Sequence, residues 1–388
     1  MMFEQLFDSI DDQKPEMIGF WEQLVNIDSG YHDLAGLEKV CFILEEQFTQ
    51  LGFQTTVHTY EKAGSTLIAD HGKPGPHILL LGHMDTVFPQ GTTVTNPFRI
   101  EGQMAYGPGV LDMKAGLVQM LFALKALKTV GCNLDGIKVL IVGDEEDGHI
   151  QSNVPDLIRE IAVETKAALC IESGKQNGEI VLGRKGVGRL MLQVEGKAAH
   201  AGYEAHLGAN AIMELCHQLI KIEAAATTME GISVNTGIIQ GGSAPNVVPD
   251  LAKAEVDVRF EDNHAFDRLE QIVQEIVQQR AINGTTLKLE AVKEYPAMAV
   301  TEGNLHLFET IRQISLQNGF GDMQYISVAG GADSSYFAAL GVPTICAFGP
   351  KGGKIHTLEE YADVESLIER TKLLAAALIE LRSDLQNS

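Results

Sequence analysis

The feature of this sequence that most constrains its fold is a series of short, mostly apolar, strand-like runs that alternate with helical patterns. Most of the runs lie in the first half of the chain and one lies near its end: Phe53–Tyr60, Ser65–Ala69, Ile78–Leu81, Val139–Val142, Ala167–Ile171 and Val342–Phe348. Such runs favour a largely parallel sheet with helices packed on both faces. Ala115–Leu127 is apolar nearly all round, which predicts a buried helix in the same domain.

The segment 187–297 has a different pattern. Apolar and polar residues alternate along Ala254–Phe260, which predicts a strand of an antiparallel sheet with one buried face, and two amphipathic helical patterns flank it. The first pattern returns after this segment. We therefore predict a discontinuous α/β domain, residues 1–186 and 298–388, into which a smaller α+β domain is inserted.

Histidines and carboxylates follow the predicted strands at the points where the strands end. They are His83 and Asp85 after Ile78–Leu81, Glu145 and Glu146 after Val139–Val142, Glu172 after Ala167–Ile171, and His356 after Val342–Phe348. Asp112 stands just before the predicted buried helix. In an open α/β sheet, ligands bind beyond the carboxyl ends of the strands, so we expect these side chains to meet at one edge.

This set of side chains indicates a metal site. Clustered carboxylates repel one another, and burying them without partners is costly, whereas a bound dication removes both penalties. Imidazole and carboxylate ligands without a thiolate favour Zn²⁺, with Co²⁺ and Mn²⁺ as alternatives. Two histidines and three carboxylates can hold two ions if one carboxylate bridges them.

Composition excludes several classes of protein. The chain has 52 Asp and Glu against 29 Lys and Arg, a formal net charge of −23, so it has no general attraction for nucleic acid or an anionic membrane. No run approaches the roughly 20 apolar residues of a membrane helix, and the N-terminus lacks the pattern of a secretory signal. The five cysteines form no CxxC pair and suit the cytoplasm. The HExxH, GxSxG, GxGxxG and phosphate-loop motifs are absent.

Eight stretches of the sequence, in order, carry a resemblance to a known family: LLLGHMDTVFP, YGPGVLDMKAG, VGDEEDGH, CIESG, GKAAHAG, GGSAPNVVPDLAKAEVDVRF, GGADSSYF and GGKIHTLEEY. The chain resembles the M20 metallopeptidases, especially the branch of glutamate carboxypeptidases and acetylornithine deacetylases. The resemblance spans nearly the whole chain. It implies a zinc-hydrolase α/β domain with an inserted lid and dimerisation domain.

The resemblance also implies a role for each motif residue of the α/β domain. His83 and Glu172 would hold one zinc ion, Glu146 and His356 would hold the other, and Asp112 would bridge the two.

Three further features of the same domain follow from the resemblance. A cis peptide would follow Asp112, Asp85 would orient His83, and Glu145 would be the general base that moves a proton from water to the leaving amine.

In the inserted domain, the resemblance implies that His200 reaches the active site of the neighbouring subunit and stabilises the oxyanion. Asn246 and Arg259 would bind the substrate, with Arg259 on its carboxylate, and Gly331 would approach the substrate through its backbone.

The sequence departs from the family pattern at two positions. His149 replaces a small residue, and we expect it to be a surface histidine close to Glu146. Tyr295 stands where glutamate-releasing relatives have an arginine, which argues against strict specificity for glutamate.

Our preferred hypothesis is a cytoplasmic, homodimeric di-zinc hydrolase. It would cleave an amide bond next to a free carboxylate and release an amino acid from a small peptide or an N-acyl amino acid. The alternative is a deacylase of the acetylornithine or succinyl-diaminopimelate type. An aminopeptidase is disfavoured because we identify no acidic anchor for a free amine. A non-catalytic relative that only binds metal or ligand is disfavoured because Glu145 and all five ligand positions are present.

Overall fold

The computed structural model describes residues 2–387, and the chain divides into two compact units. The first unit consists of Met1–Leu182, Val300–Ser327 and Ala332–Ser388, and the second of Gly183–Ala299 and Val328–Gly331. The sequence predicts boundaries after residues 186 and 297, and it does not predict the return of Val328–Gly331 to the second unit. No helix among the described residues combines the length and the apolar run that crossing a bilayer requires.

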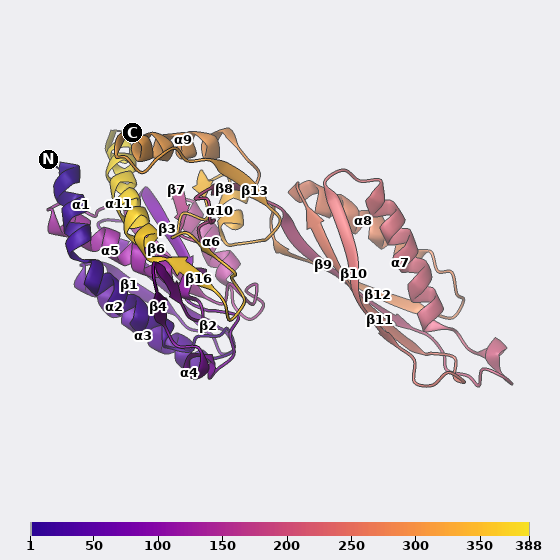
Figure 1. Ribbon diagram of the computed structural model, residues 1–388. Helices are drawn as coiled ribbons and strands as arrows, with labels where there is room; N and C mark the ends of the chain where they lie inside the picture. The colour runs from indigo at the N-terminus through magenta and orange to yellow at the C-terminus, as the bar shows by residue number, and fades with distance from the viewer. Residues whose placement is uncertain (1, 388) are drawn as a thin grey trace. The chain divides into compact units, whose positions relative to one another are not determined.

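A six-stranded sheet forms the centre of the first unit, in the order β1-β2-β6-β3-β7-β14 (Figure 1). Its strands are β1 (Gln54–His58), β2 (Gly64–His71), β3 (His77–His83), β6 (Ile137–Gly143), β7 (Thr165–Cys170) and β14 (Thr344–Ile345). Strands β6, β3, β7 and β14 are parallel, whereas β2 runs antiparallel to both β1 and β6. The sheet is therefore mixed. Its parallel part, as expected, contains the strands that end at the histidine and the carboxylates.

Both faces of the parallel strands are buried, as their sequences predict. Ile78 and Leu80 of β3 belong to the main core cluster, while Leu79 and Leu81, which point to the opposite face, are also fully buried. The main cluster is built with helices α1 (Met2–Asp12), α2 (Lys14–Val25), α3 (Leu34–Gln50), α5 (Gly116–Thr129), α9 (Glu302–Gln317) and α11 (Val364–Asn387). Helix α10 (Ser334–Ala339) packs on β7, on β14 and on α6 (Val154–Ala162).

The apolar run Val342–Phe348 differs from its prediction, because only Thr344–Ile345 is a strand. Ala347 has a φ of +58°, a left-handed conformation that cannot continue an extended chain. The remaining short elements of the unit are α4 (Thr92–Thr95), β4 (Arg99–Glu101), β5 (Met104–Tyr106), η1 (Val110–Ala115), β8 (Ile180–Arg184), β13 (Tyr325–Val328), β15 (Gly352–Gly353) and β16 (Tyr361–Asp363). Strands β15, β16, β5 and β4 form a small antiparallel sheet, and β13 pairs with β8.

The second unit is an antiparallel sheet with two helices packed on it. Its elements are β9 (Gly186–Glu195), η2 (Ala205–Leu207), α7 (Ala211–Thr227), β10 (Ile232–Gly241), β11 (Leu251–Phe260), α8 (Asn263–Gln278) and β12 (Thr286–Tyr295). The strand order is β10-β11-β9-β12, and the predicted alternation is present in β11, where Val256, Val258 and Phe260 are buried in the core under α7 and α8.

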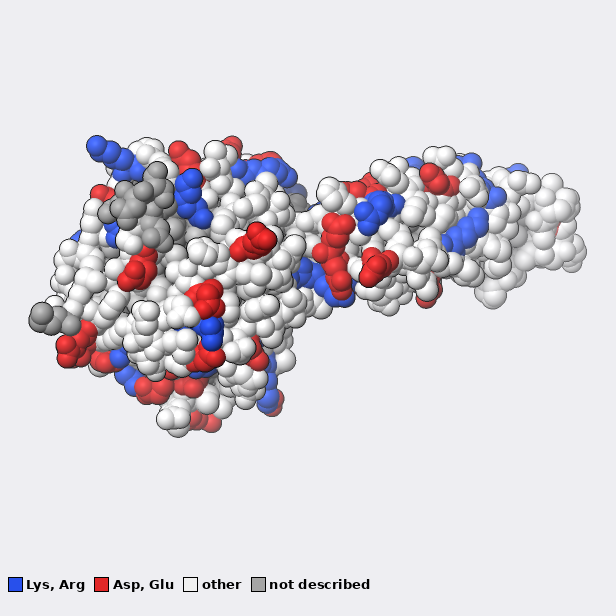
Figure 2. Space-filling model, turned by 90° about the horizontal axis from the view of Figure 1, so that it is seen from above, with Lys and Arg blue, Asp and Glu red and all other residues white. Residues whose placement is uncertain are grey.

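Charged side chains are distributed rather than gathered on the face of the molecule seen in Figure 2, where Lys and Arg lie among Asp and Glu. The carboxylates that the sequence places at the strand ends are instead buried or half-buried, and they are described next.

Candidate metal centre

The exits of three neighbouring strands deliver side chains to one edge of the central sheet. His83 is the last residue of β3, Glu145 and Glu146 follow β6, and Glu172 follows β7. Because the three strands are parallel, their carboxyl ends lie at the same edge.

Asp112 reaches this edge from η1, just before the buried helix α5. The helix comes close to β7 because residue 116 is a glycine: a Cβ on Gly116 would lie 2.2 Å from the carbonyl oxygen of Ile171. This close approach brings Asp112 beside Glu172. The peptide bond from Asp112 to Met113 is cis, as the resemblance implies.

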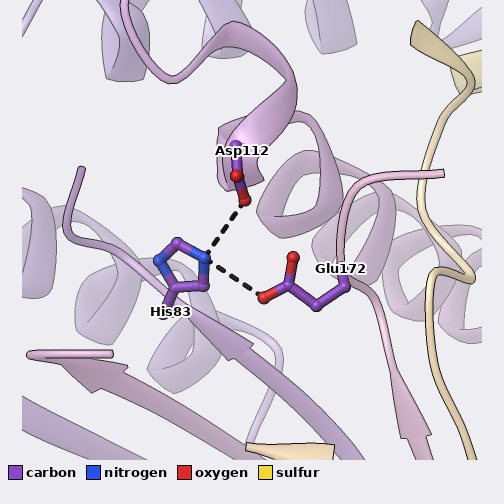
Figure 3. A group of neighbouring side chains, drawn as sticks. All are labelled: His83, Asp112 and Glu172. Atoms are coloured by element: carbon purple, nitrogen blue, oxygen red, sulfur yellow. Dashed lines mark ion pairs between the residues drawn. The ribbon is translucent and has the colours of Figure 1, made fainter. Parts of the chain in front are cut away.

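Two groups of three side chains result, and Asp112 belongs to both. In the first group, Nε2 of His83 lies 3.4 Å from Oδ1 of Asp112 and 3.2 Å from Oε1 of Glu172 (Figure 3). In the second, Nε2 of His356 lies 3.3 Å from Oδ2 of Asp112 and 3.3 Å from Oε2 of Glu146. Asp112 therefore turns one carboxylate oxygen toward each histidine, which is the arrangement of a bridging ligand.

The spacing of these donor atoms suits a bound divalent metal ion, for which zinc gives the scale. Zinc–ligand bonds of about 2.0–2.2 Å place neighbouring ligand atoms about 3.3–3.6 Å apart at the corners of a tetrahedron. The four observed separations are 3.2–3.4 Å, close to that spacing. In addition, Nδ1 of His83 faces the backbone oxygen of Asp85 at 3.0 Å, which makes Nδ1 the donor and leaves Nε2 as a lone-pair donor to a cation.

The electrostatics of the site also demand positive charge between the carboxylates. Burial by itself would lower the pKa of His83, but the charge of Glu172 and the hydrogen bonds to Asp112 and Asp85 raise it well above its usual value. Hydrogen bonds to Asp112 and Glu146 raise the pKa of His356 to about 10. Burial would raise the pKa of Asp112, yet hydrogen bonds from the two histidines hold it below its usual value. Protons on the two imidazoles thus occupy the place that metal cations would take.

Asp85 does more than the sequence indicates. Its carboxylate is fully buried and accepts hydrogen bonds from the backbone N–H of Glu145 at 3.2 Å and of Glu146 at 2.8 Å. Asp85 therefore fixes both His83 and the loop after β6. The side chain of Glu145 is half-buried, and burial together with the charges of Glu172, Asp333 and Glu146 raises its pKa well above the usual value, although His83 opposes this.

Sequence reasoning missed Glu360, whose buried carboxylate holds the loop of Asp112. It accepts hydrogen bonds from the backbone N–H of Gly109 at 3.3 Å, Leu111 at 2.7 Å and Asp112 at 2.9 Å. The sequence contained one signal that could have identified Glu360: it lies four residues after His356, in the motif GGKIHTLEEY.

The expectation of a surface histidine at position 149 is wrong. His149 is 5% exposed, and its ring lies between the carboxylates of Asp144 and Asp333. Two buried carboxylates that face the ring from opposite sides provide the reason: they bind the imidazole more strongly than water would.

The other expected site residues belong to the second unit. Nδ1 of His200 accepts hydrogen bonds from the backbone N–H of Gly202 and Tyr203, so the proton of the neutral ring is on Nε2, and the ring is exposed. Asn246 is also exposed. Its backbone carbonyl oxygen accepts a hydrogen bond from the backbone N–H of Ala201, the residue after His200, so Asn246 lies beside His200.

Arg259 and Gly331 each have a defined neighbour in the second unit. The guanidinium of Arg259 donates two hydrogen bonds to Asp257, at 2.9 and 3.0 Å. Tyr295 is 9% exposed, and its ring packs so closely on Gly331 that a Cβ there would lie 2.7 Å from it.

Known proteins match this chain over most of its length. Residues 79–380 match the model of peptidase family M20/M25/M40. The chain is 31% identical to carboxypeptidase G2 of Pseudomonas sp. over 97% of its own length and 92% of the relative. It is 27% identical to a succinyl-diaminopimelate desuccinylase of Bradyrhizobium sp. over 87% of this chain and 92% of that protein.

Solved structures confirm the fold class. An aminopeptidase of Bacillus cereus superposes with a TM-score of 0.77 at 23% identity and covers 94% of this chain and 98% of that one. An M20 family metallo-carboxypeptidase of Sulfolobus solfataricus has a TM-score of 0.73 at 18% identity, with 94% and 98% covered. The chain is therefore an enzyme of the metallohydrolase type, and it belongs to peptidase family M20/M25/M40.

Proposed function

We propose that this enzyme is a di-zinc hydrolase that cleaves an amide bond next to a free carboxylate and releases an amino acid from a small peptide or an N-acyl amino acid. The observation that carries the proposal is the position of Asp112, which has one carboxylate oxygen in each of two metal-ligand groups. The similarity to a carboxypeptidase and to a desuccinylase supports the substrate class, because both names describe cleavage of an amide beside a carboxylate.

The ligands would divide between two ions. His83 and Glu172 would hold one, Glu146 and His356 the other, and Asp112 would bridge them. When bound, a pair of such cations supplies polarisation of the amide carbonyl and acidification of a water molecule.

Glu145 would act as the general base. A carboxylate with a raised pKa can take the proton of the attacking water and release it to the leaving amine. Asp85 supports this role because it holds the backbone N–H of Glu145 and so limits where the carboxylate can move.

The second unit would serve as the lid and the dimerisation domain. His200 would reach the active site of the partner subunit, where its Nε2–H could donate to the oxyanion, since Nδ1 is already an acceptor. Arg259 would bind the substrate carboxylate, and Asp257 now takes the two-pronged position that such a carboxylate would need. Asn246 and the backbone of Gly331 would complete the substrate contacts.

A second candidate function is an N-acyl-amino-acid deacylase of the acetylornithine or succinyl-diaminopimelate type. Tyr295 favours it, because a phenol packed on Gly331 replaces the arginine of glutamate-releasing relatives and cannot form an ion pair with a glutamate side chain. Both candidates use the same metal ligands. The cytoplasm suits either one, because the five cysteines are widely spaced and form no CxxC pair.

A hydrolysis panel with zinc-loaded protein tests the proposal and separates the two candidates. The panel compares N-acyl amino acids, aryl- and folyl-glutamates, dipeptides and their C-terminally amidated analogues. Preference for substrates with a free carboxylate is expected, and the class with the higher kcat/KM, peptides or N-acyl amino acids, decides between the candidates. Absence of hydrolysis across the panel would contradict the proposal.

The Glu145→Gln variant tests the base within the same panel. We expect retained metal and a turnover lower by about 10²–10⁴-fold, because a positioned base contributes that much. The matched control is Glu359→Gln, since Glu359 is an exposed glutamate of the same unit. Near-wild-type turnover of Glu145→Gln would show that another group is the base.

Action of His200 across a dimer is tested with mixed subunits. His200→Ala should lose turnover and keep metal, and mixing it with Glu145→Gln should restore part of the activity in hybrid dimers. No recovery after verified subunit exchange would count against action in the partner's site.

A further inference from the structure

His149 lies at the centre of a buried cluster of charged side chains beside the proposed base. Its Nδ1 is 2.9 Å from Oδ1 of Asp144, and its Nε2 is 2.6 Å from Oδ1 of Asp333. The His149 ring is fully buried, and the two carboxylates are almost so. Asp144 directly precedes Glu145 and Glu146 in the loop after β6, whereas Asp333 directly precedes α10. The ring therefore joins the two segments.

Both ring nitrogens of His149 face a carboxylate oxygen. A neutral imidazole has one N–H, and a carboxylate only accepts hydrogen bonds, so only the imidazolium can satisfy both Asp144 and Asp333. Burial by itself would lower the pKa of His149, but the charge of Asp333 and the hydrogen bond and charge of Asp144 raise it well above its usual value. The ring is thus held at both nitrogens, by Asp144 at Nδ1 and by Asp333 at Nε2.

The two carboxylates depend on this ring. Within residues 2–387, the second oxygens, Oδ2 of Asp144 and Oδ2 of Asp333, are buried and have no hydrogen-bond partner. If the imidazolium were removed, two buried carboxylates would lose their counter-charge, which is among the costliest changes in a protein interior. Relief would require movement of the loop after β6 or of the start of α10.

Movement of that loop would displace the proposed base and one metal ligand. Asp85 fixes the loop at the backbone N–H of Glu145 and Glu146, and the backbone N–H of Gly148 donates to the carbonyl oxygen of Glu145. The His149 ring supplies the anchor at the other end of the loop, and it ties the loop to the segment that precedes α10.

We propose that His149 is a positioning residue whose imidazolium, clamped between Asp144 and Asp333, holds the loop after β6 so that Glu145 and Glu146 face the metal site. The proposal rests on the proposed function for the role of Glu145. Its geometric part, the placement of Glu146 as a metal ligand, can be measured without any substrate.

The test compares His149→Asn with the control His306→Asn, which changes an exposed histidine of α9. Asparagine can donate to Asp144 but is too short to reach Asp333 as well. We expect altered visible absorption bands of the Co²⁺-loaded protein and a fall in kcat of about 10–100-fold with KM changed less than about threefold. The control should match the wild type in both.

Unchanged absorption bands and unchanged kcat in folded His149→Asn would overturn the proposal. A lowered melting temperature with both readouts unchanged would also overturn it, because the histidine would then be purely structural. If His149→Asn fails to fold, the same measurements are made on Asp333→Asn. This variant keeps the shape of the side chain and removes its charge, and the same outcomes support or overturn the proposal. Absence of hydrolysis by the wild type would instead refute the proposed function and leave the Co²⁺ bands to decide this inference.

Discussion

Loading the metal site should release protons, and the number follows from the structure. Nε2 of His83 and Nε2 of His356 each lie 3.2–3.4 Å from two carboxylate oxygens, so each imidazole holds a proton when no cation is present. A metal ion binds only the unprotonated nitrogen. Each ion must therefore displace one proton, which gives about two protons per chain at neutral pH for two ions.

The sign of the pH dependence follows from the raised pKa values. Below the pKa of about 10 of His356, the proton competes with the ion, so metal affinity should rise as the pH rises. With one proton displaced per ion, each binding constant should increase about tenfold per pH unit between about pH 6 and pH 8. The Asp112 carboxylate, whose pKa is lowered, contributes no proton because it is already ionised.

Calorimetric titration of metal-free protein with zinc, in two buffers of different ionisation enthalpy, counts the protons directly. Chelator competition at several pH values gives the slope of the affinity. His356→Gln should bind one ion less and release about one proton fewer, whereas His306→Gln, which changes an exposed histidine, should behave as the wild type. Zinc binding without proton release, or with an affinity independent of pH, would refute the reasoning and the proposed ligand pair of histidines.

Three further variants test other parts of the structure. Glu360→Gln should weaken zinc binding about 10–100-fold, because its carboxylate holds the loop of the bridging ligand, while Glu359→Gln should not change zinc affinity in a chelator competition. Gly116→Ala should lower the free energy of unfolding by about 1–3 kcal/mol in urea, since its Cβ would lie 2.2 Å from the Ile171 oxygen; an unchanged midpoint would contradict this. Arg259→Ala should raise KM for substrates with a free carboxylate, and an equal effect on amidated analogues would remove that role.

The parts of the fold that sequence could predict are those determined by local apolar pattern. The runs that became β3, β6 and β7 are continuous stretches of aliphatic residues, and both faces of those strands are buried. β12 (Thr286–Tyr295), an edge strand, was not predicted, although its apolar residues Leu287, Leu289 and Ala291 alternate with polar residues and pack against the core of the second unit. This alternation is the same signal that predicts β11, so the strand could have been predicted from the sequence.

The sequence predicted only part of the candidate site. Residues at strand exits could be assigned to one edge of the sheet, because parallel strands share a direction. Contacts between distant segments could not: Glu360 reaches back to a loop about 250 residues earlier, and His149 meets Asp333 across 184 residues. No local pattern encodes such pairs, and a histidine in a polar loop has the same appearance whether it is exposed or enclosed.

The net charge of the chain does not reveal the site, whereas the positions of individual carboxylates do. The formal net charge is −23, yet Asp112, Glu146 and Glu172 lie in the two ligand groups, where two dications would add +4. Asp144 and Asp333 enclose an imidazolium, and Asp85 accepts backbone N–H groups. Each of these carboxylates therefore has local partners, and most of the 52 Asp and Glu lie elsewhere on the chain. The net charge of such a chain is a sum over all of its charged residues, so it does not indicate the sign of its ligand.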